Sequence, residues 1–477
     1  MPRARPPRPD LIVVLIDDLR FDEVGFCGHP YMKTPHIDRI GREGTHFANA
    51  FHTTPLCSPN RASIVTGQYA SRHGVLDNVA RDALSHRLPN YHLILQRLGY
   101  ETAHVGKWHM GNSSAPRPGY DHWVSFPGHG SIVDPVLDEN GVSTQHRGYI
   151  TDLLNERALA FVDRVHDRPY ALFLAHKAVH PDAFQAPDGT LDPRGGGYIP
   201  APRHADLYRG EHFPPRPNVT TPDRAVRTKP AFAEAFGLRD TEAGRKVMDW
   251  IKSGSQEEIR LRAAMMASVD EGMGQLWDAI ERRGRLQDTL VIFLGDNGYF
   301  FGEHALGPER RFAYEEGIRS PFLAYWPRGF DAGRTVSKMV IAQDIAPTLV
   351  EAAGGKPSDV RHMHGRSLLP LGRAARGPVP WRSSFMCEYF TENAMPWLHG
   401  MTYKAVRTDR WKYIHWVQKS LAGTECDELY DLRADPYEMK NLIRSRAHAP
   451  VVSKLRRELA RLVAESIGLG TRPHGAP

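Results

Sequence analysis

Short apolar runs alternate with segments of helical period over the first two-thirds of the chain. Apolar runs at 11–16 and 170–175 are typical of buried strands. The segment 289–296, which ends in polar residues, and the segment 102–105 are also predicted to be strands. Between these runs, apolar residues recur every three or four positions, which predicts helices at 35–42, 58–66, 91–97, 149–165, 256–283 and 342–353. Because strands and helices alternate, we expect an α/β fold with a large, mainly parallel mixed sheet flanked by helices on both faces.

The pattern changes near residue 375. Beyond it, short segments joined by turns predict strands at 382–389, 401–408, 411–417 and 428–432, and a terminal helix at 451–467. This order predicts a smaller C-terminal antiparallel sheet with a terminal helix. We therefore expect two units, a large α/β domain over 1–375 and a small α+β subdomain over 376–477.

Residues 181–255 interrupt the large unit. They are dense in Pro, Gly and Arg and predict only short helices, at 232–236 and 241–251. A long insertion of this kind is typical of a binding loop or a lid. We expect it to help select the substrate, together with the loop 392–400, which carries Trp397 and His399.

The composition and charge of the chain argue against several classes of protein. The chain has 477 residues and a net charge of +6, but its Lys and Arg residues are scattered, which argues against nucleic-acid binding. The four cysteines are far apart and form neither a disulfide scaffold nor a zinc framework. No apolar run is long enough for a signal peptide or a membrane span, so we expect no membrane association and a cytoplasmic location. The oligomeric state is not indicated.

An acid pair and an Asp-Asn pair follow apolar strands. Asp17 and Asp18 end the first strand, and Asp296 and Asn297 end the strand at 289–296. In open α/β sheets the site lies beyond the carboxyl ends of the strands, and oxygen ligands without Cys or His suit calcium or magnesium. The alternative is that each pair caps its own strand or helix.

A third candidate is Cys57, at the start of the helix predicted for 58–66. Ser58 suits the N-cap and Pro59 the first helical position, so Cys57 would lie near free backbone amides. Arg61, one turn later, can turn back toward it. This arrangement suits an anion or an activated nucleophile, although a buried cysteine beside a capped helix explains the same pattern.

Cationic and titratable side chains complete the set of candidates. Lys107 and His109 are two residues apart, His180 follows the strand at 170–175, and Arg310 precedes Arg311 in a loop. A lysine or arginine can neutralise an anionic oxygen, and a histidine can exchange protons near neutral pH. Each of these residues, taken alone, is more often solvated surface.

Several of these segments together resemble the sulfatase family. CSPNRAS at 57–63 and TGQYASRHGV at 66–75 resemble the family signature, whose core is Cys-x-Pro-x-Arg. Further segments are similar to the family in the same order: LIDDLR (15–20), residues 34–51, GKWHMG (106–111), AHKAVHP (175–181), LGDNGYFFGEHAL (294–306), YEEGIRSP (314–321) and ELYDLRADPYEMKNL (428–442).

The resemblance implies a fold of the alkaline phosphatase superfamily and a formylglycine made from Cys57 by a formylglycine-generating enzyme. It implies calcium, with Mg²⁺ as the alternative, bound by Asp17, Asp18, Asp296, Asn297 and one oxygen of the modified residue 57. The hydrated formylglycine, a gem-diol, would be the nucleophile.

The resemblance also assigns roles to the cations and histidines. Arg61 and Lys107 would hold the gem-diol and sulfate oxygens. His109 would be the base that collapses the sulfated intermediate, and His180 would bind beside the ester oxygen and protonate the leaving group. Arg310 stands where the family commonly has Lys; it keeps the charge and can clamp sulfate, but it is a poor proton donor.

Three functions remain open at this point. The first is a sulfatase, with a sulfated saccharide or a sulfated small molecule as substrate. The second is a phosphonate monoester or phosphodiester hydrolase of the same superfamily. The third is a catalytically silent anion-binding protein in which Cys57 stays a thiol. The Arg and aromatic residues of the insertion favour a polar, carbohydrate-like ligand.

Overall fold

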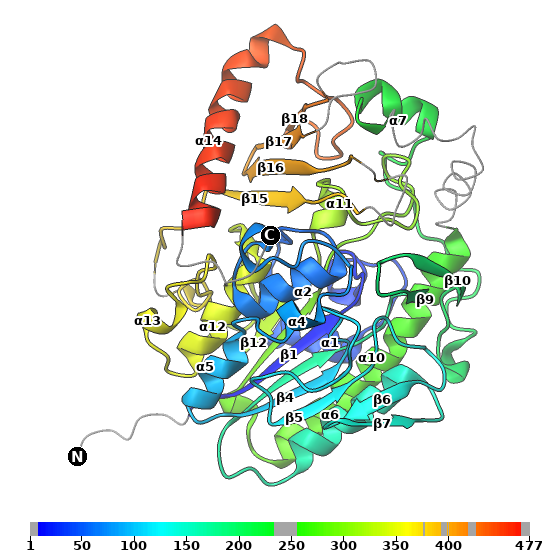
Figure 1. The fold of residues 1–477 in the computed structure, drawn as a ribbon, viewed down its shortest axis with the longest axis vertical. Coiled ribbons are helices and arrows are strands. Elements are labelled where there is room, and N and C mark those ends of the chain that lie inside the picture. Colours follow the sequence, from blue (N-terminus) through cyan, green and yellow to red (C-terminus); the bar gives the residue numbers. More distant parts are fainter. Residues whose placement is uncertain are drawn as a thin grey trace.

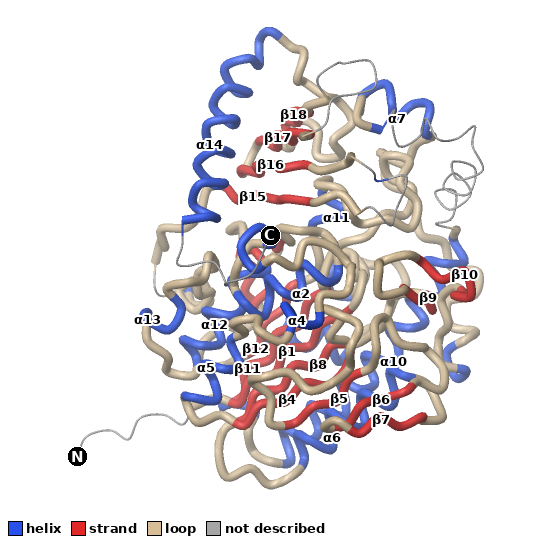
Figure 2. Tube along the Cα trace, in the orientation of Figure 1, coloured by secondary structure: helices blue, strands red, loops and turns tan. Residues whose placement is uncertain are grey.

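A ten-stranded mixed sheet forms the centre of the molecule, and a four-stranded antiparallel sheet lies above it in Figure 1. The computed structural model describes residues 8–232, 255–374, 377–392, 398, 400–417 and 426–468, without the side chains of 185 and 191–195. The main sheet has the strand order β13-β2-β12-β11-β1-β8-β4-β5-β6-β7. Its part from β12 to β7 can be followed in Figure 2. The α/β fold class expected from the sequence is confirmed.

The middle of the main sheet is parallel. Five neighbouring strands run in one direction: β11 (Thr289–Gly295), β1 (Asp10–Ile16), β8 (Tyr170–Ala175), β4 (Glu101–Gly106) and β5 (His122–Ser125). Antiparallel pairing appears only toward the edges, at β12 (Phe322–Tyr325), β2 (Thr45–Phe47), β6 (Val136–Glu139) and β7 (Val142–Gln145), while β13 (Arg334–Val336) pairs parallel with β2. The carboxyl ends of the five parallel strands therefore share one edge.

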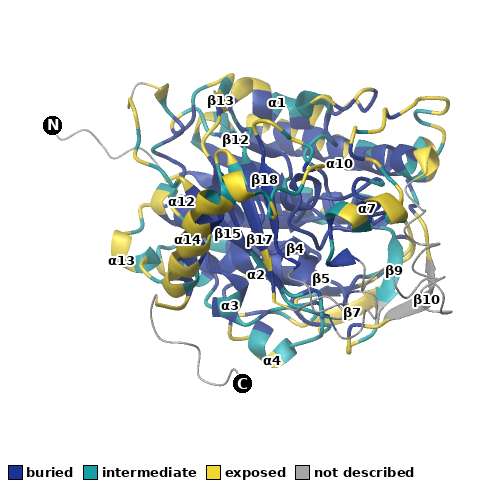
Figure 3. Cartoon of the chain, turned by 90° about the horizontal axis from the view of Figure 1, so that it is seen from above, coloured by how far each residue is buried: buried dark blue, intermediate teal, exposed yellow. Residues whose placement is uncertain are grey.

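Helices cover both faces because successive residues of a strand point to opposite sides. Ile12, Val14 and Ile16 of β1 pack with α1 (Pro35–Glu43), α6 (Ile150–Asp163) and α10 (Gln256–Arg282). The alternate residues Leu11, Val13 and Leu15 pack with α2 (Cys57–Thr66), α5 (Tyr91–Arg97) and α12 (Ile345–Ala352). β1 is accordingly buried along its whole length, whereas the edge strand β7 is exposed (Figure 3).

The longest helix, α10, begins at a capping box. The Ser255 hydroxyl accepts a hydrogen bond from the Glu258 amide, and the Glu258 carboxylate accepts one from the Ser255 amide. Two backbone donors that a helix start leaves free are thus satisfied. No helix in the described ranges is long and apolar enough to cross a membrane.

The insertion at 181–255 is only partly described. Its described part contains β9 (Asp182–Gln185) paired with β10 (Leu191–Gly196), and α7 (Pro222–Thr228). The expectation of helices alone was wrong there, because a two-stranded pair rich in Gly and Pro carries no alternating apolar signal. The predicted helix at 241–251 and most of that at 232–236 lie outside the described residues, as do Trp397 and His399.

The C-terminal sheet contains β15 (Ser384–Tyr389), β16 (Tyr403–Thr408), β17 (Trp411–Trp416) and β18 (Glu428–Asp431). The terminal helix α14 (Ala449–Gly468) packs Leu455 and Leu459 against Met386, Val406 and Tyr413 of this sheet. The antiparallel sheet and terminal helix are as expected. The boundary predicted between 375 and 376 lies outside the described residues, so the division into two units stays a prediction.

A buried ion cluster joins the C-terminal sheet to a short helix that precedes it in the chain. Lys412 of β17 lies with its Nζ 2.9 Å from Glu315 Oε1 and 2.8 Å from Glu438 Oε1, and all three side chains are buried. Glu315 begins α11 (Glu315–Ile318), which belongs to the larger part of the chain. The lysine therefore neutralises two acids contributed by different elements.

Replacing Lys412 by Met is expected to lower the free energy of unfolding by about 3–5 kcal/mol, because it removes the cation that Glu438 and Glu315 share. Glu315 keeps the more distant guanidinium groups of Arg407, at 3.4 Å, and Arg319, at 3.7 Å. Urea unfolding followed by tryptophan fluorescence measures the change. Lys454→Met, at an exposed position of α14, is the matched control. Equal stability of the two variants would contradict a structural role for the cluster.

Candidate active site

Four neighbouring parallel strands deliver the predicted residues to one edge of the main sheet. Asp17 and Asp18 follow β1, and Asp296 and Asn297 follow β11, whose last residue lies opposite Ile16. Lys107 and His109 follow β4, and His180 follows β8 after a short turn. All of these side chains are buried.

The Asp17-Asp18 pair and the Asp296-Asn297 pair are hydrogen-bonded to each other. The Asp18 amide donates to Asp296 Oδ1 at 2.9 Å, and Asn297 Nδ2 donates to Asp18 Oδ1 at 2.8 Å. The β1–β11 register places the strand ends side by side, and these bonds then fix the side chains. The oxygens of both pairs therefore converge, as the sequence predicted.

Cys57 is the first residue of α2 and faces these acids. Its Sγ lies 3.4 Å from Asp17 Oδ1 and 3.9 Å from Asp18 Oδ1. Burial, and then Asp17, raise the pKa of the thiol well above its usual range. The unmodified side chain is therefore a neutral thiol here, which is a weaker nucleophile than a thiolate.

The predicted capping of this helix was wrong. Leu56, not Ser58, is the N-cap residue, and the Ser58 amide donates to the side chain of Asn78 at 3.1 Å. The Ser58 hydroxyl donates instead to the carbonyl of His109. A distant asparagine thus replaces the local cap, which frees Ser58 to fix the segment that carries His109.

Three cations face the three carboxylates. Arg61 Nε lies 2.8 Å from Asp296 Oδ2, Arg310 Nη1 lies 3.0 Å from Asp18 Oδ2, and Lys107 Nζ forms an ion pair with Asp17 Oδ2. Each carboxylate thus has a cationic partner, and Asp17 has a second one, because Arg61 Nη2 lies 3.8 Å from Asp17 Oδ2.

The loop that carries Arg310 is fixed by its neighbours. Glu309 Oε1 accepts hydrogen bonds from the amides of Arg310 at 2.6 Å and Arg311 at 2.9 Å. The Arg311 guanidinium pairs with Glu309 and Glu392, away from the acids. Of the two adjacent arginines, Arg310 is therefore the one that reaches the site.

The oxygens fit a hard cation. Burial and then Asp17 raise the pKa of Asp296 to about 7, and burial also raises the pKa of Asp18. Burial opposes ionisation of Asp17 too, but Lys107 and Arg61 lower its pKa. Asn297 Oδ1 is buried and accepts no hydrogen bond within the described ranges. Converging carboxylates and a free amide oxygen are the ligands that calcium and magnesium prefer.

Three imidazoles lie beside the cations. His180 Nδ1 donates to the Pro181 carbonyl at 2.8 Å, and its Nε2 lies 3.8 Å from Asp18 Oδ2. His109 Nδ1 lies 3.4 Å from Ser58 Oγ, on a backbone with a φ of 53°, a conformation that non-glycine residues seldom adopt. The third imidazole is His129, which the sequence did not nominate. Burial, and then Lys107, lower the pKa of all three.

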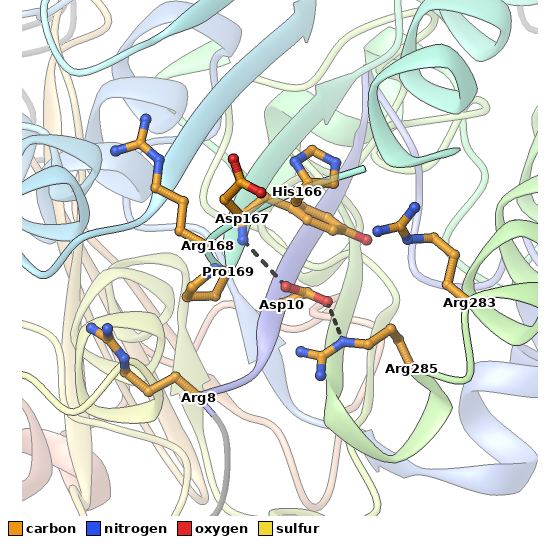
Figure 4. A pocket seen from close by; sticks show the side chains of 9 residues that line it. Arg8, Asp10, His166, Asp167, Arg168, Pro169, Arg283 and Arg285 are labelled. Carbon is orange, nitrogen blue, oxygen red and sulfur yellow. Dashed lines mark hydrogen bonds and ion pairs between the residues drawn. The ribbon is translucent and has the colours of Figure 1, made fainter. Parts of the chain in front are cut away.

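A pocket at the amino end of β1 is separate from the candidate active site (Figure 4). It has a volume of about 300 Å³ and is lined by four arginines. Asp10 within it accepts hydrogen bonds from Arg285 Nε at 2.8 Å and from the Tyr170 amide at 3.2 Å. It lies at the opposite end of β1 from Asp17, so it is no part of the candidate site.

Comparison with known proteins identifies the family. The family model described as Sulfatase matches residues 9–355.

The chain belongs to the sulfatase family.

This sulfatase also matches, over residues 302–465, a model described as N-sulphoglucosamine sulphohydrolase, C-terminal. It is 28% identical to an N-acetylglucosamine-6-O-sulfatase of Bacteroides thetaiotaomicron, over 96% of this chain and 86% of that protein. It is 27% identical to human N-acetylglucosamine-6-sulfatase, over 92% and 81%. The enzyme class, a sulfuric ester hydrolase, is confirmed.

Solved structures agree with the fold. A protein in complex with its substrate D-glucosamine-2-N,6-O-disulfate superposes with a TM-score of 0.79 at 26% identity, covering 96% of this chain and 98% of that one. A phosphonate monoester hydrolase of Agrobacterium radiobacter superposes with a TM-score of 0.74 at 23% identity, covering 96% of each chain. The second likeness concerns the fold alone.

Proposed function

We propose that this sulfatase hydrolyses the sulfate ester of a saccharide to an alcohol and inorganic sulfate, with Cys57 acting after its oxidation to formylglycine. The observation that carries the proposal is the placement of Cys57 Sγ, 3.4 Å from Asp17, among oxygen ligands and cations on one edge of the sheet. A formylglycine-generating enzyme would be the maturation partner. Hydrated formylglycine supplies two hydroxyls, one to attack sulfur and one to release sulfate.

Calcium, with magnesium as the alternative, would be held by Asp17, Asp18, Asp296, Asn297 and one oxygen of the modified residue 57. The free Oδ1 of Asn297 and the raised pKa of Asp296 support this ligand set. The cation would stabilise negative charge that develops on the sulfuryl oxygens. It would also relieve the repulsion among the carboxylates.

The cationic side chains would bind the anion. Arg61 Nε donates to Asp296, and Nη1 donates to the Lys107 carbonyl at 2.6 Å. Its Nη2 forms no hydrogen bond and lies 3.8 Å from Asp17 Oδ2, so Nη2 is the atom that would contact residue 57. Lys107 and Arg310 would hold the sulfate oxygens. Arg310 keeps its proton at any working pH, so it would clamp the sulfate without protonating the leaving group.

The histidines would move protons. The lowered pKa of His109 keeps its imidazole neutral near pH 7, which suits a base that accepts a proton from a hydroxyl of residue 57. His180 would protonate the ester oxygen that leaves. Burial, and then Lys107 and Lys177, lower its pKa, and a bound sulfate anion would oppose these cations and favour the proton.

A sulfated amino sugar is the substrate we propose. Support comes from the relatives named as N-acetylglucosamine 6-sulfatases and from the structural neighbour bound to D-glucosamine-2-N,6-O-disulfate. The insertion at 181–255 and the loop at 392–400 remain our candidates for the segments that select the sugar. The proposal also retains the two units, 1–375 with the site and 376–477.

Matched ester substrates test the reaction class. With matured, calcium-loaded protein, we expect kcat/KM for glucosamine 6-O-sulfate to exceed that for the corresponding phosphate ester and for a nitrophenyl phosphonate monoester by about 100-fold or more. A preference for the phosphonate would favour the phosphonate monoester hydrolase alternative. Calcium binding without turnover of any ester would favour the silent anion-binding alternative.

A further inference from the structure

His129 reaches the site from the fifth parallel strand. It lies four residues beyond β5, between Gly128 and Gly130, whose φ angles of 53° and 64° are ones that glycine adopts readily. A Cβ at Gly130 would lie 2.3 Å from the ring of Phe126, so the loop passes closely over that ring. The His129 side chain is 3% exposed. The loop therefore buries an imidazole where a solvated turn would otherwise be expected.

The hydrogen bond that His129 forms has a defined direction. Its Nδ1 lies 3.1 Å from Nζ of Lys107. An ammonium group has donors only, so Lys107 donates and His129 Nδ1 accepts. The imidazole is therefore neutral, with its proton on Nε2, and the Lys107 ammonium is held between His129 and Asp17.

The ring of His129 also separates the two other histidines. Its centroid lies 4.0 Å from that of His109, with 50° between the planes, and 4.5 Å from that of His180, with 28° between the planes. The three imidazoles thus form one packed row. The rings of His109 and His180 each pack on one side against the ring of His129.

We propose that His129 is a positioning residue for sulfate binding and ester hydrolysis, an inference that rests on the proposed function. Its Nδ1 directs the Lys107 ammonium toward the position of the sulfate, and its ring keeps His109 and His180 apart. Lysine has a flexible stem and three donors, so its direction depends on the acceptors around it. Without an acceptor at residue 129, the ammonium is drawn fully onto Asp17.

Two substitutions separate the two contributions of His129. His129→Gln keeps an oxygen that accepts from Lys107 but removes the ring, whereas His129→Phe keeps a ring and removes the acceptor. Both are measured in the matured, calcium-loaded full chain. The readouts are kcat and KM with nitrophenyl sulfate, and the affinity for inorganic sulfate by calorimetry in a Cys57→Ala background, which requires no turnover.

We expect His129→Phe to weaken sulfate binding about tenfold and to lower kcat by about 10- to 100-fold. His129→Gln is expected to bind sulfate within about threefold of the parent, with kcat lowered by the loss of the ring. His92→Phe is the matched control, since His92 is also buried and stacked on an aromatic ring, Tyr91, and should change neither quantity. If His129→Phe does not fold, His129→Met supplies the variant without an acceptor.

Equal sulfate affinities for the Gln and Phe variants would overturn the positioning role, as would a Phe variant with unchanged kcat. These outcomes differ from failure of the proposed function. Suppose that the unsubstituted protein hydrolyses no sulfate ester, but that the His129→Gln and His129→Phe variants still differ in their affinity for sulfate. The proposed reaction would then be wrong, whereas the role of the contact between His129 and Lys107 would be supported.

Discussion

Replacing Cys57 by Ala is expected to lower sulfate-ester turnover by at least about 10,000-fold, because it removes the group that bonds to sulfur. The remaining acids, cations and histidines would still bind the substrate, so binding of a sulfated sugar should survive. Cys57→Ser adds a sharper result. A serine has one hydroxyl and no second one to release sulfate, so it should give at most one equivalent of alcohol product per protein molecule.

The matched control is Cys387→Ala, which removes another buried thiol from β15 in the C-terminal sheet. Its turnover should stay near that of the parent. Steady turnover by Cys57→Ala, measured as release of nitrophenol from nitrophenyl sulfate, would contradict the assigned nucleophile. Loss of turnover in both variants would point instead to damage of the fold.

Removal of the cation should have an effect of similar size. Chelation, or the substitution Asp296→Asn, is expected to lower turnover by at least about 1,000-fold, because charge on the sulfuryl oxygens loses its main stabiliser. Calcium that binds only the folded protein should also raise the melting temperature of the parent. Asp296→Asn should reduce that rise, since it removes one charged ligand from the set.

Asp163→Asn is the control for this prediction. Asp163 forms a surface ion pair with Arg282 at 3.3 Å, and its side chain is about half exposed. The Asp163→Asn variant should therefore keep the turnover of the parent and the same rise in melting temperature with calcium. Titration with calcium followed by differential scanning calorimetry measures the second quantity. Unchanged turnover after exhaustive chelation would remove the cation from the proposed function.

The strand-end residues could be predicted from the sequence because their signal is local. A run of five or six apolar residues marks β1, β8 and β11, and the polar residues that follow must lie at the same edge of a parallel sheet. Asp17 and Asp296 were found in this way. Their roles as ligands depended on the family resemblance and stay a proposal.

The same rule would have found His129, but the strand that delivers it was not predicted. β5 has four residues, His122–Ser125, two of them polar, so neither length nor alternation marks it. The outer strands β2, β12 and β13 were missed because three or four residues are too few to show a periodic pattern. The capping of α2 by Asn78 was equally hidden, because it joins residues 20 positions apart through a tertiary contact.

The most direct test is the mass of the tryptic peptide Glu43–Arg61, which contains Cys57, taken from protein co-expressed with a formylglycine-generating enzyme. Formylglycine lowers the peptide mass by about 18 Da relative to the thiol, and hydration restores about as much. We expect the lighter peptide, in a fraction that rises in step with sulfate-ester turnover. A preparation that hydrolyses sulfate esters at full rate while Cys57 remains an unmodified thiol would contradict the proposed mechanism.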